Sequence, residues 1–239
     1  MISSTQNQQI KTHKKLQQKK YRVKEQKLLI EGEHLLQEAK KKGLLISTYH
    51  QKPHPEYKEG TIVSPHVMKY LTAAKTPPLD AGVAKISPPK TMDDKVLILE
   101  NIQDPGNVGT LLRSALAFGF NSVIIDESAD PYSQKVLRST QGAIFSLNLH
   151  FLDVKTFKQK YPHALYGAHL APQKKARKKP TPPYAIILGN EGSGLTPSTV
   201  ELLDHTLTIP IDSIDSLNVA VAGSIIMHSI AMKQSLFTG

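Results

Sequence analysis

Hydrophobic and polar positions change their period along residues 91–239 in a way that predicts strands and helices in turn. The apolar run "VLILE" (96–100) predicts a buried strand, residues 106–118 predict a helix that Gly119 stops, and "SVIID" (122–126) predicts the next strand. Further strands are predicted at 143–151, 164–170, 184–189 and 205–211, with helical turns near 133–139, 153–161 and 197–204. Strands that alternate with helices predict an α/β fold in which helices cover a parallel sheet.

The last helix is predicted to start near Ser216 and to run almost to the end of the chain. Its face includes small residues, namely Ala220, Ala222, Gly223 and Ser224. Small side chains let another helix or loop approach closely, so tight packing or a dimer contact is expected here. The apolar run "LNVAVAGSIIMHSIAM" is too short and too often interrupted by polar residues to span a bilayer, and it indicates a buried helix.

The first 90 residues follow a different pattern. "LLIEGEHLLQEAKKKG" predicts a helix that ends at Gly43, "LLISTYH" predicts a strand, and "SPHVMKYLTAA" predicts a helix with Ser64 as its cap and Pro65 at its first position. The segment "TPPLDAGVAKISPPKTMDD" is rich in turn residues and is interpreted as a linker. These features place a boundary near residue 90, between domains at 1–90 and 91–239.

Charge is distributed unevenly between these two parts. Residues 1–90 hold 17 Lys or Arg against 7 Asp or Glu, whereas residues 91–239 hold 13 of each kind, so the whole net charge of +10 lies in the first part. Such a split indicates that one domain meets a polyanion. Nucleic acid is the leading candidate, ahead of a membrane surface, because no apolar helix face accompanies the lysines. For the first 20 or so residues alone, a solvated and partly disordered tail is an equal alternative.

Composition excludes several kinds of chemistry. The chain has no cysteine, which excludes disulfides, thiolate zinc sites and cysteine nucleophiles and is typical of a protein of the reducing cytoplasm. The first 27 residues contain no apolar stretch that could form the core of a signal peptide. The histidines are scattered without metal-ligand spacing, and no metal site is predicted.

Three segments that follow predicted strands are dense in Gly, Asn, Ser, Pro and charge: "ENIQDPGNVGTLLRSALAFG" (100–119), "ILGNEGSGLTP" (187–197) and "IPIDSIDSLNVAVAG" (209–223). Open α/β sheets bind ligands beyond the carboxyl ends of their strands. Each segment alone is weak evidence, because Asp-Pro-Gly-Asn is most often a turn, "GNEGSG" can be a permissive loop and "DSLN" can be a helix cap. Three of them in one domain predict a ligand site.

The common nucleotide-binding signatures do not fit these segments. "GNEGSGL" lacks the Gly-Lys-Ser/Thr ending of a phosphate loop. It also lacks the order of glycines in the dinucleotide fingerprint, and no acidic residue follows at the required distance in another strand.

The three segments resemble the ordered motifs of the SpoU or TrmH-like branch of the SPOUT methyltransferases, which transfer a methyl group from S-adenosylmethionine to a ribose 2′-hydroxyl of RNA. The resemblance covers most of residues 96–232. It implies a parallel-sheet α/β catalytic domain with a trefoil knot at 91–239, one of the few exceptions to unknotted chains. "LLIEGEHLLQEA" looks like the start of the small α+β RNA-binding domain, similar to a ribosomal protein fold, that precedes the catalytic domain in many members.

By this resemblance, the site residues are Arg113, Asn107, Glu191, Ser216 and Asn218, and the donor is held mainly by backbone groups of Gly189, Ile209 and Leu217. In the family the arginine contacts the 2′-hydroxyl and is often described as its base. A guanidinium normally stays protonated, so we expect Arg113 to stabilise the developing alkoxide instead. Glu191 is the expected charge partner of Arg113, while Asp104 and Pro105 are assigned to the shape of the turn.

The resemblance also implies a homodimer that acts on RNA, with ribosomal RNA expected ahead of transfer RNA because a basic extra domain suits a large folded RNA. A non-catalytic RNA-binding or ribosome-assembly factor is the alternative from another class. Self-protection against a ribosome-directed antibiotic is a third, which the sequence does not separate from housekeeping modification. The basic run "QKKARKKP" (173–180) is a hypothetical clamp for RNA phosphates.

Overall fold

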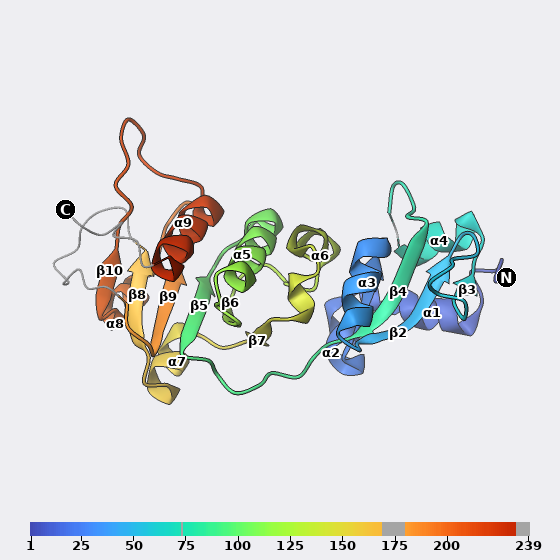
Figure 1. Cartoon of the computed structure of the whole chain (residues 1–239), viewed down its shortest axis with the longest axis horizontal. Coiled ribbons are helices and arrows are strands. Elements are labelled where there is room, and N and C mark those ends of the chain that lie inside the picture. Colours follow the sequence, from blue (N-terminus) through green and yellow to red (C-terminus); the bar gives the residue numbers. More distant parts are fainter. Residues whose placement is uncertain (73, 169–179, 233–239) are drawn as a thin grey trace. The chain divides into compact units, whose positions relative to one another are not determined.

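The computed structural model describes residues 1–72, 74–168 and 180–232. These residues form two compact units, each described here by itself (Figure 1). The first unit comprises Met1–Pro88 together with Tyr132–Phe145, and the second comprises Pro89–Pro131 together with Ser146–Gly239. The basic run predicted to clamp RNA lies outside the described residues except for Pro180.

The first unit is built on a four-stranded sheet in the order β1-β4-β2-β3. β4 runs antiparallel to both β1 and β2, and β3 pairs in parallel with the end of β2. Apolar residues of the sheet and of the helices that cover it share one core, which includes Ile10, Leu29, Tyr49 and Met68. The elements are α1 (Gln8–Lys14), the 3-10 turn η1 (Lys15–Gln17), α2 (Lys19–Glu25), β1 (Lys27–Glu31), α3 (Glu33–Lys41), β2 (Leu45–His50), β3 (Thr61–Ile62), α4 (Pro65–Thr72), β4 (Asp80–Lys85), α6 (Gln134–Thr140) and the 3-10 turn η2 (Ala143–Phe145).

Two expectations for the first unit are wrong, and the alternative of a disordered tail is not borne out. Most of residues 8–25 form α1, η1 and α2, and Ile10 and Leu16 are buried in the core. The predicted long helix is divided, since its first residues are the buried strand β1 and Gly32, with φ +88, turns the chain into α3. The expected linker contains β4, the strand between β1 and β2 in the sheet, whose short apolar run is hidden in the sequence by flanking prolines.

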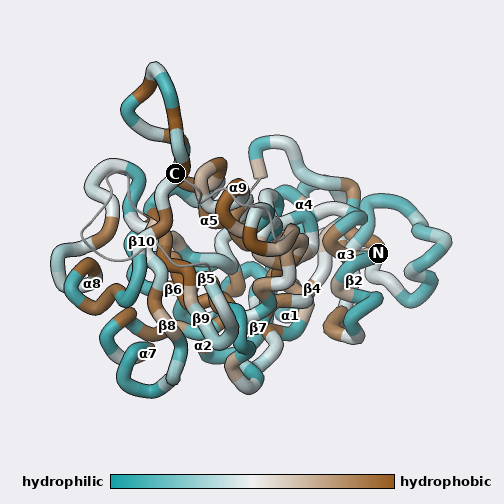
Figure 2. The backbone as a smooth tube through the Cα atoms, turned by 60° about the vertical axis from the view of Figure 1, so that its left-hand side comes forward, coloured by the Kyte–Doolittle hydropathy of each residue, from teal (hydrophilic) through white to brown (hydrophobic). Residues whose placement is uncertain are grey.

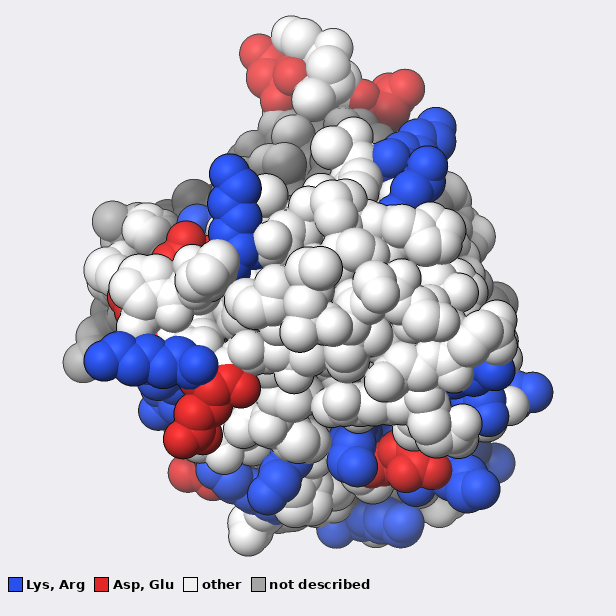
Figure 3. Space-filling view, turned by 90° about the vertical axis from the view of Figure 1, so that its right-hand side faces the viewer, with Lys and Arg blue, Asp and Glu red and all other residues white. Residues whose placement is uncertain are grey.

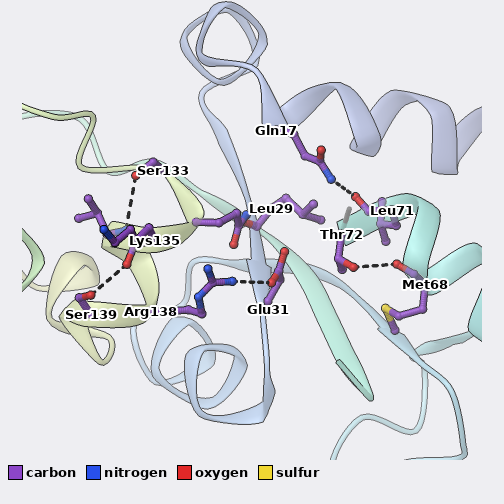
Figure 4. Close-up of polar contacts among 12 residues, drawn as sticks. Gln17, Leu29, Glu31, Met68, Leu71, Thr72, Ser133, Lys135, Arg138 and Ser139 are labelled. Carbon is purple, nitrogen blue, oxygen red and sulfur yellow. Dashed lines mark hydrogen bonds and ion pairs between the residues drawn. The ribbon is translucent and has the colours of Figure 1, made fainter. Parts of the chain in front are cut away.

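Residues 132–145 pack with the first unit, although the pattern of strands and helices placed them inside the second domain. The side-chain amide of Gln134 donates to the carbonyl of Leu29 on the edge strand β1 at 2.7 Å. Arg138 Nη1 lies 3.3 Å from Glu31 Oε2 (Figure 4). These long-range contacts draw α6 to the first unit. The chain therefore passes between the two units three times.

The second unit holds a six-stranded sheet in the order β10-β8-β9-β5-β6-β7, and its described strand pairs are all parallel. The predicted α/β class with a parallel sheet is confirmed, and Figure 2 shows apolar positions along its strands. The knot implied by the resemblance stays a prediction. The elements are β5 (Lys95–Glu100), α5 (Pro105–Ala117), β6 (Ser122–Asp126), β7 (Asn148–His150), α7 (Val154–Lys160), β8 (Ala164–Ala168), β9 (Tyr184–Leu188), α8 (Pro197–Leu202), β10 (His205–Leu207) and α9 (Val219–Ala231).

The predicted strand at 143–151 is mostly wrong. Residues Ala143–Phe145 form the turn η2, and only Asn148–His150 form a strand. The last helix begins at Val219, three residues after the predicted start. No helix among the described residues is long and apolar enough to cross a membrane.

The small residues of α9 pack against α5, the helix beside it in Figure 1. A β-carbon added at Gly223 would lie 2.6 Å from Leu111 Cδ2, which is closer than real contacts allow. One turn away, the hydroxyl oxygens of Ser114 and Ser224 lie 2.8 Å apart. The tight packing predicted from the small residues is confirmed within the chain, whereas the dimer contact stays a prediction.

Candidate active site

The three motif-bearing segments follow strands of the parallel sheet. β5 and β9 are adjacent and in register, with Leu99 opposite Leu188, so the loops that leave their carboxyl ends start side by side. The third segment joins β10 to α9. Because parallel strands end at one edge of the sheet, residues far apart in the sequence can meet there.

The Asp-Pro turn shapes the start of α5. Asp104 caps the helix, since its Oδ1 accepts hydrogen bonds from the backbone N–H groups of Gly106 (2.7 Å) and Asn107 (3.0 Å). Pro105 occupies the first helical position, where its missing N–H costs nothing. As expected, these two residues set the shape of the turn, and they fix Asn107 in the first turn of the helix.

Side chains from all three segments form one directed chain of hydrogen bonds. Asn218 Nδ2 donates to Asn107 Oδ1 at 3.0 Å, and Asn107 Nδ2 donates to Glu191 Oε1, also at 3.0 Å. Asn218 Oδ1 accepts from the backbone N–H groups of Ala220 and Val221 and thereby caps α9. Every amide group in this chain has its oxygen and its nitrogen in use, so both side chains have one defined orientation.

Glu191 is the acceptor at the end of this chain. Besides Asn107, it accepts from the backbone N–H of Asp104 (3.1 Å) and of Gln103 (3.2 Å). Partial burial by itself raises the pKa of Glu191, but the hydrogen bonds from Asn107 and from backbone N–H groups outweigh it, and the net pKa is lowered. The carboxylate is therefore ionised at neutral pH and ties the β9 loop to the start of α5.

A pocket of about 170 Å³ opens beside Glu191. The three residues expected to hold the donor, Gly189, Ile209 and Leu217, all line it, as does Ser216. Its wall combines apolar side chains with the backbone of the glycine-rich loop that follows β9. The other lining residues are Ala168, Leu188, Asn190, Gly192, Gly194, Leu207, Ile211, Val219, Ala222 and Ile226.

Gly189 is needed for the closure of its own loop. A β-carbon at Gly189 would lie 2.5 Å from the carbonyl oxygen of Gly194 and would overlap the backbone nitrogen of Leu195. The two backbone segments approach so closely because Asn190 and Gly194 exchange N–H to carbonyl hydrogen bonds of 3.0 Å. The space left by the missing side chain is thus filled by the backbone of Gly194 and Leu195.

Arg113 lies apart from this network. Its side chain is on the exposed face of α5, and it forms no ion pair with Glu191. The expected pairing is wrong because Glu191 contacts the first turn of α5, and Arg113 lies roughly 9 Å further along the helix axis than Asn107 at 1.5 Å per residue. The structure brings together Asn107, Glu191 and Asn218, and it leaves the arginine facing solvent.

Two further residues organise the site and were missed from the sequence. Asn190 Nδ2 donates to the carbonyl of Asn101 at 2.9 Å, which joins the β9 loop to the β5 loop. Glu100, buried at the end of β5, accepts from the backbone N–H of Thr196 (3.0 Å) and from its hydroxyl (2.8 Å). Glu100 is the last residue of β5 and Asn190 lies two residues beyond β9, both within the quoted motifs. A polar residue close to the end of an apolar run is the signal that could have found them.

Asp126, at the end of β6, has a perturbed carboxyl. Burial raises the pKa of Asp126 to about 6, the hydrogen bond from the backbone N–H of Val154 opposes this shift, and the nearby carboxylates of Glu100, Asp153 and Glu127 add to it. Between pH 3.8 and about 6, the folded protein therefore retains a proton on Asp126 that the unfolded chain has already lost.

We expect Asp126→Asn to flatten the pH dependence of stability. In the wild type, the protonated Asp126 carboxyl contributes to the free energy of unfolding. This contribution is complete below the ordinary pKa of 3.8 and is lost as the pH rises through about 6. The free energy of unfolding should change by only about 1 kcal/mol, because solvent screens a half-buried group. Urea unfolding at pH 4.5 and at pH 7 measures it: the free energy of unfolding should fall across this interval more in the wild type than in the variant. Equal changes in both proteins would contradict the assignment.

Comparisons with known proteins agree with this arrangement. Residues 94–228 match the model of the SpoU rRNA Methylase family, and residues 7–79 match the model of the MRM3-like substrate binding domain. The 23S rRNA (guanosine(2553)-2'-O)-methyltransferase RlmP of Bacillus subtilis (strain 168) is 33% identical over 246 residues, covering 96% of this chain and 98% of that protein.

Solved structures give the same result. An RNA 2'-O ribose methyltransferase superposes with a TM-score of 0.77 at 26% identity, covering 99% of each chain. The AdoMet-bound rRNA methyltransferase from Sinorhizobium meliloti shares the fold, with a TM-score of 0.80 at 24% identity over 97% of each chain. The fold, the order of the motifs and the match over more than half of the residues lead to one conclusion. The chain belongs to the SpoU rRNA Methylase family.

Proposed function

We propose that this protein transfers a methyl group from S-adenosylmethionine to a ribose 2′-hydroxyl of ribosomal RNA. The observation that carries the proposal is the series of hydrogen bonds from Asn218 to Asn107 to Glu191, which links the three family motifs beside one pocket. Membership of the SpoU family supports methyl transfer, and the name of the Bacillus subtilis relative, which is a 23S rRNA methyltransferase, supports ribosomal RNA ahead of transfer RNA.

We assign the pocket lined by Gly189, Ile209 and Leu217 to S-adenosylmethionine. Apolar side chains such as Leu188 and Leu217 suit the adenine ring, and the backbone of the loop from Gly189 offers polar groups for its edges and for the ribose. The donor, when bound, supplies the sulfonium methyl group. The protein contributes by holding the acceptor oxygen in line and by excluding water from it.

Arg113 is assigned to the acceptor oxygen. It is exposed and has no ion pair among the described residues, so its guanidinium is available to substrate. As a permanent cation it stabilises the alkoxide that develops when the 2′-hydroxyl loses its proton, and the proton leaves to water or to a neighbouring group. Asn107, Ser216 and Asn218 are proposed to position the target nucleotide near it.

We also infer a homodimer, located in the cytoplasm as the lack of cysteine suggests. Support comes from exposed apolar side chains on α9 and on the loop before it, with Val221 49% and Ile214 57% exposed. Apolar groups gathered on a surface favour burial in an interface. Light scattering at micromolar concentration should give twice the mass of the chain, and a monomer would contradict the inference.

Methyl transfer from radiolabelled S-adenosylmethionine tests the proposed function. The acceptors are unmodified 23S rRNA, 16S rRNA and a transfer RNA pool, and alkaline hydrolysis then maps any resistant linkage. We expect label at one alkali-resistant linkage of ribosomal RNA. Label in the transfer RNA pool alone would make transfer RNA the substrate in place of ribosomal RNA. Donor binding without label in any pool would favour a non-catalytic assembly factor.

A further inference from the structure

The first 24 residues concentrate positive charge on α1, η1 and α2. They contain seven Lys or Arg and no Asp or Glu. One of the seven, Arg22, is buried, and its Nη1 donates to the carbonyls of Leu16 and Gln17, so it serves the fold. Lys15, Lys19, Lys20 and Lys24 are exposed. Figure 3 shows several Lys and Arg side chains on the lower part of one face, with Asp and Glu side chains among them.

Two of these lysines converge on one aromatic ring. Lys15 Nζ lies 5.6 Å from the centroid of the Tyr21 ring, and Lys20 Nζ lies 5.0 Å from the same centroid. A ring attracts ammonium groups through its negative face, with about 0.5–1 kcal/mol for an exposed contact. Tyr21 therefore has two ammonium groups within 6 Å of the centre of its ring.

The described part of the chain offers this pair no carboxylate partner. Among the described residues, neither Lys15 nor Lys20 forms an ion pair with Asp or Glu. Lys14, on the same stretch, is used differently, because its Nζ donates to the carbonyl of Tyr70 while lying over that ring. Lys41 is also different, since Glu38 Oε1 lies 2.6 Å from its Nζ.

We propose that Lys15, Lys20 and Tyr21 form a clamp for the phosphate backbone of the RNA substrate. The clamp rests on the proposed function, because it assigns the RNA to a particular surface of the first unit. Flexible lysines ordinarily lose side-chain entropy when they bind an anion. The ring of Tyr21 orders both ammonium groups beforehand, so less side-chain entropy is lost when they bind RNA phosphates.

A matched pair of double variants tests the clamp. K15Q/K20Q and K41Q/K42Q each remove two positive charges from the first unit, but only the former removes the pair at Tyr21. Filter binding to unmodified 23S rRNA transcript is measured between 50 and 200 mM salt, conditions for which phosphate contacts dominate the salt dependence. Thermal unfolding confirms that each variant is folded.

We expect K15Q/K20Q to weaken RNA binding about 10-fold at 100 mM salt and to reduce the slope of log K against log salt by about 1.4–2. K41Q/K42Q should weaken binding less than about 2-fold. Equal losses in the two double variants would overturn the clamp, because charge alone would then account for the binding.

The ring is tested separately. Tyr21→Leu should weaken RNA binding about 3-fold, and Tyr21→Phe, which keeps the ring, should bind like the wild type. Unchanged binding in Tyr21→Leu would show that the ring does not organise the lysines and would overturn the proposal. If the wild type binds no RNA, both the clamp and the proposed function are overturned. If the wild type transfers the methyl group but the two double variants lose RNA binding equally, only the clamp is overturned.

Discussion

Arg113→Ala is expected to lower kcat for methyl transfer about 10²–10³-fold, which is the usual effect of removing one group that stabilises an oxyanion. The Kd for S-adenosylmethionine should stay unchanged, because Arg113 neither lines the pocket nor contacts Glu191. Single-turnover methyl transfer with saturating RNA measures the chemical step, and calorimetry measures donor binding. This separation of kcat from donor affinity distinguishes a catalytic role from a structural one.

Two variants control this result. Arg113→Lys keeps the charge but loses the planar fork, so its kcat should stay close to that of Arg113→Ala. Thr110→Ala changes an exposed residue one turn earlier on the same face of α5 and should leave kcat within about 2-fold of the wild type, as exposed substitutions usually do. A kcat for Arg113→Ala within threefold of the wild type would remove Arg113 from the reaction.

Gly189→Ala is expected to abolish detectable binding of S-adenosylmethionine and to lower the free energy of unfolding by about 1–3 kcal/mol, the typical cost of overpacking. The added methyl group would lie 2.5 Å from the carbonyl oxygen of Gly194, which is backbone and cannot rotate away. The loop must then shift, and with it Glu191 and the wall of the pocket. Calorimetric titration with the donor and urea unfolding measure the two effects.

The matched control is Gly192→Ala, three residues further in the same loop. There, the nearest atom to an added β-carbon is Asn190 Oδ1 at 3.6 Å, an ordinary contact. Its free energy of unfolding should lie within about 0.5 kcal/mol of the wild type, the usual range for an unstrained surface change. Equal stability of Gly189→Ala and Gly192→Ala would show that the loop closes without the space at Gly189.

The sequence by itself determined the elements whose cause is local. Runs such as "VLILE" and "SVIID" are strands β5 and β6 because an apolar stretch of that length is buried on both faces of a parallel sheet. Asp104 and Pro105 start α5 because their side chains suit the first positions of any helix. "DSLN" is indeed a helix cap, through Asn218, and the same side chain also reaches Asn107.

Tertiary structure decided the features that depend on partners distant in the sequence. Glu191 accepts from Asn107 rather than from Arg113, since helix geometry turns the arginine away from the loop. The linker-like segment around 80–85 became the strand β4 because β1 and β2 pair with it on both sides, which local propensity does not reveal. Hydrogen bonds to β1 drew residues 132–145 to the first unit. Such contacts arise from pairing between segments, and no single segment encodes them.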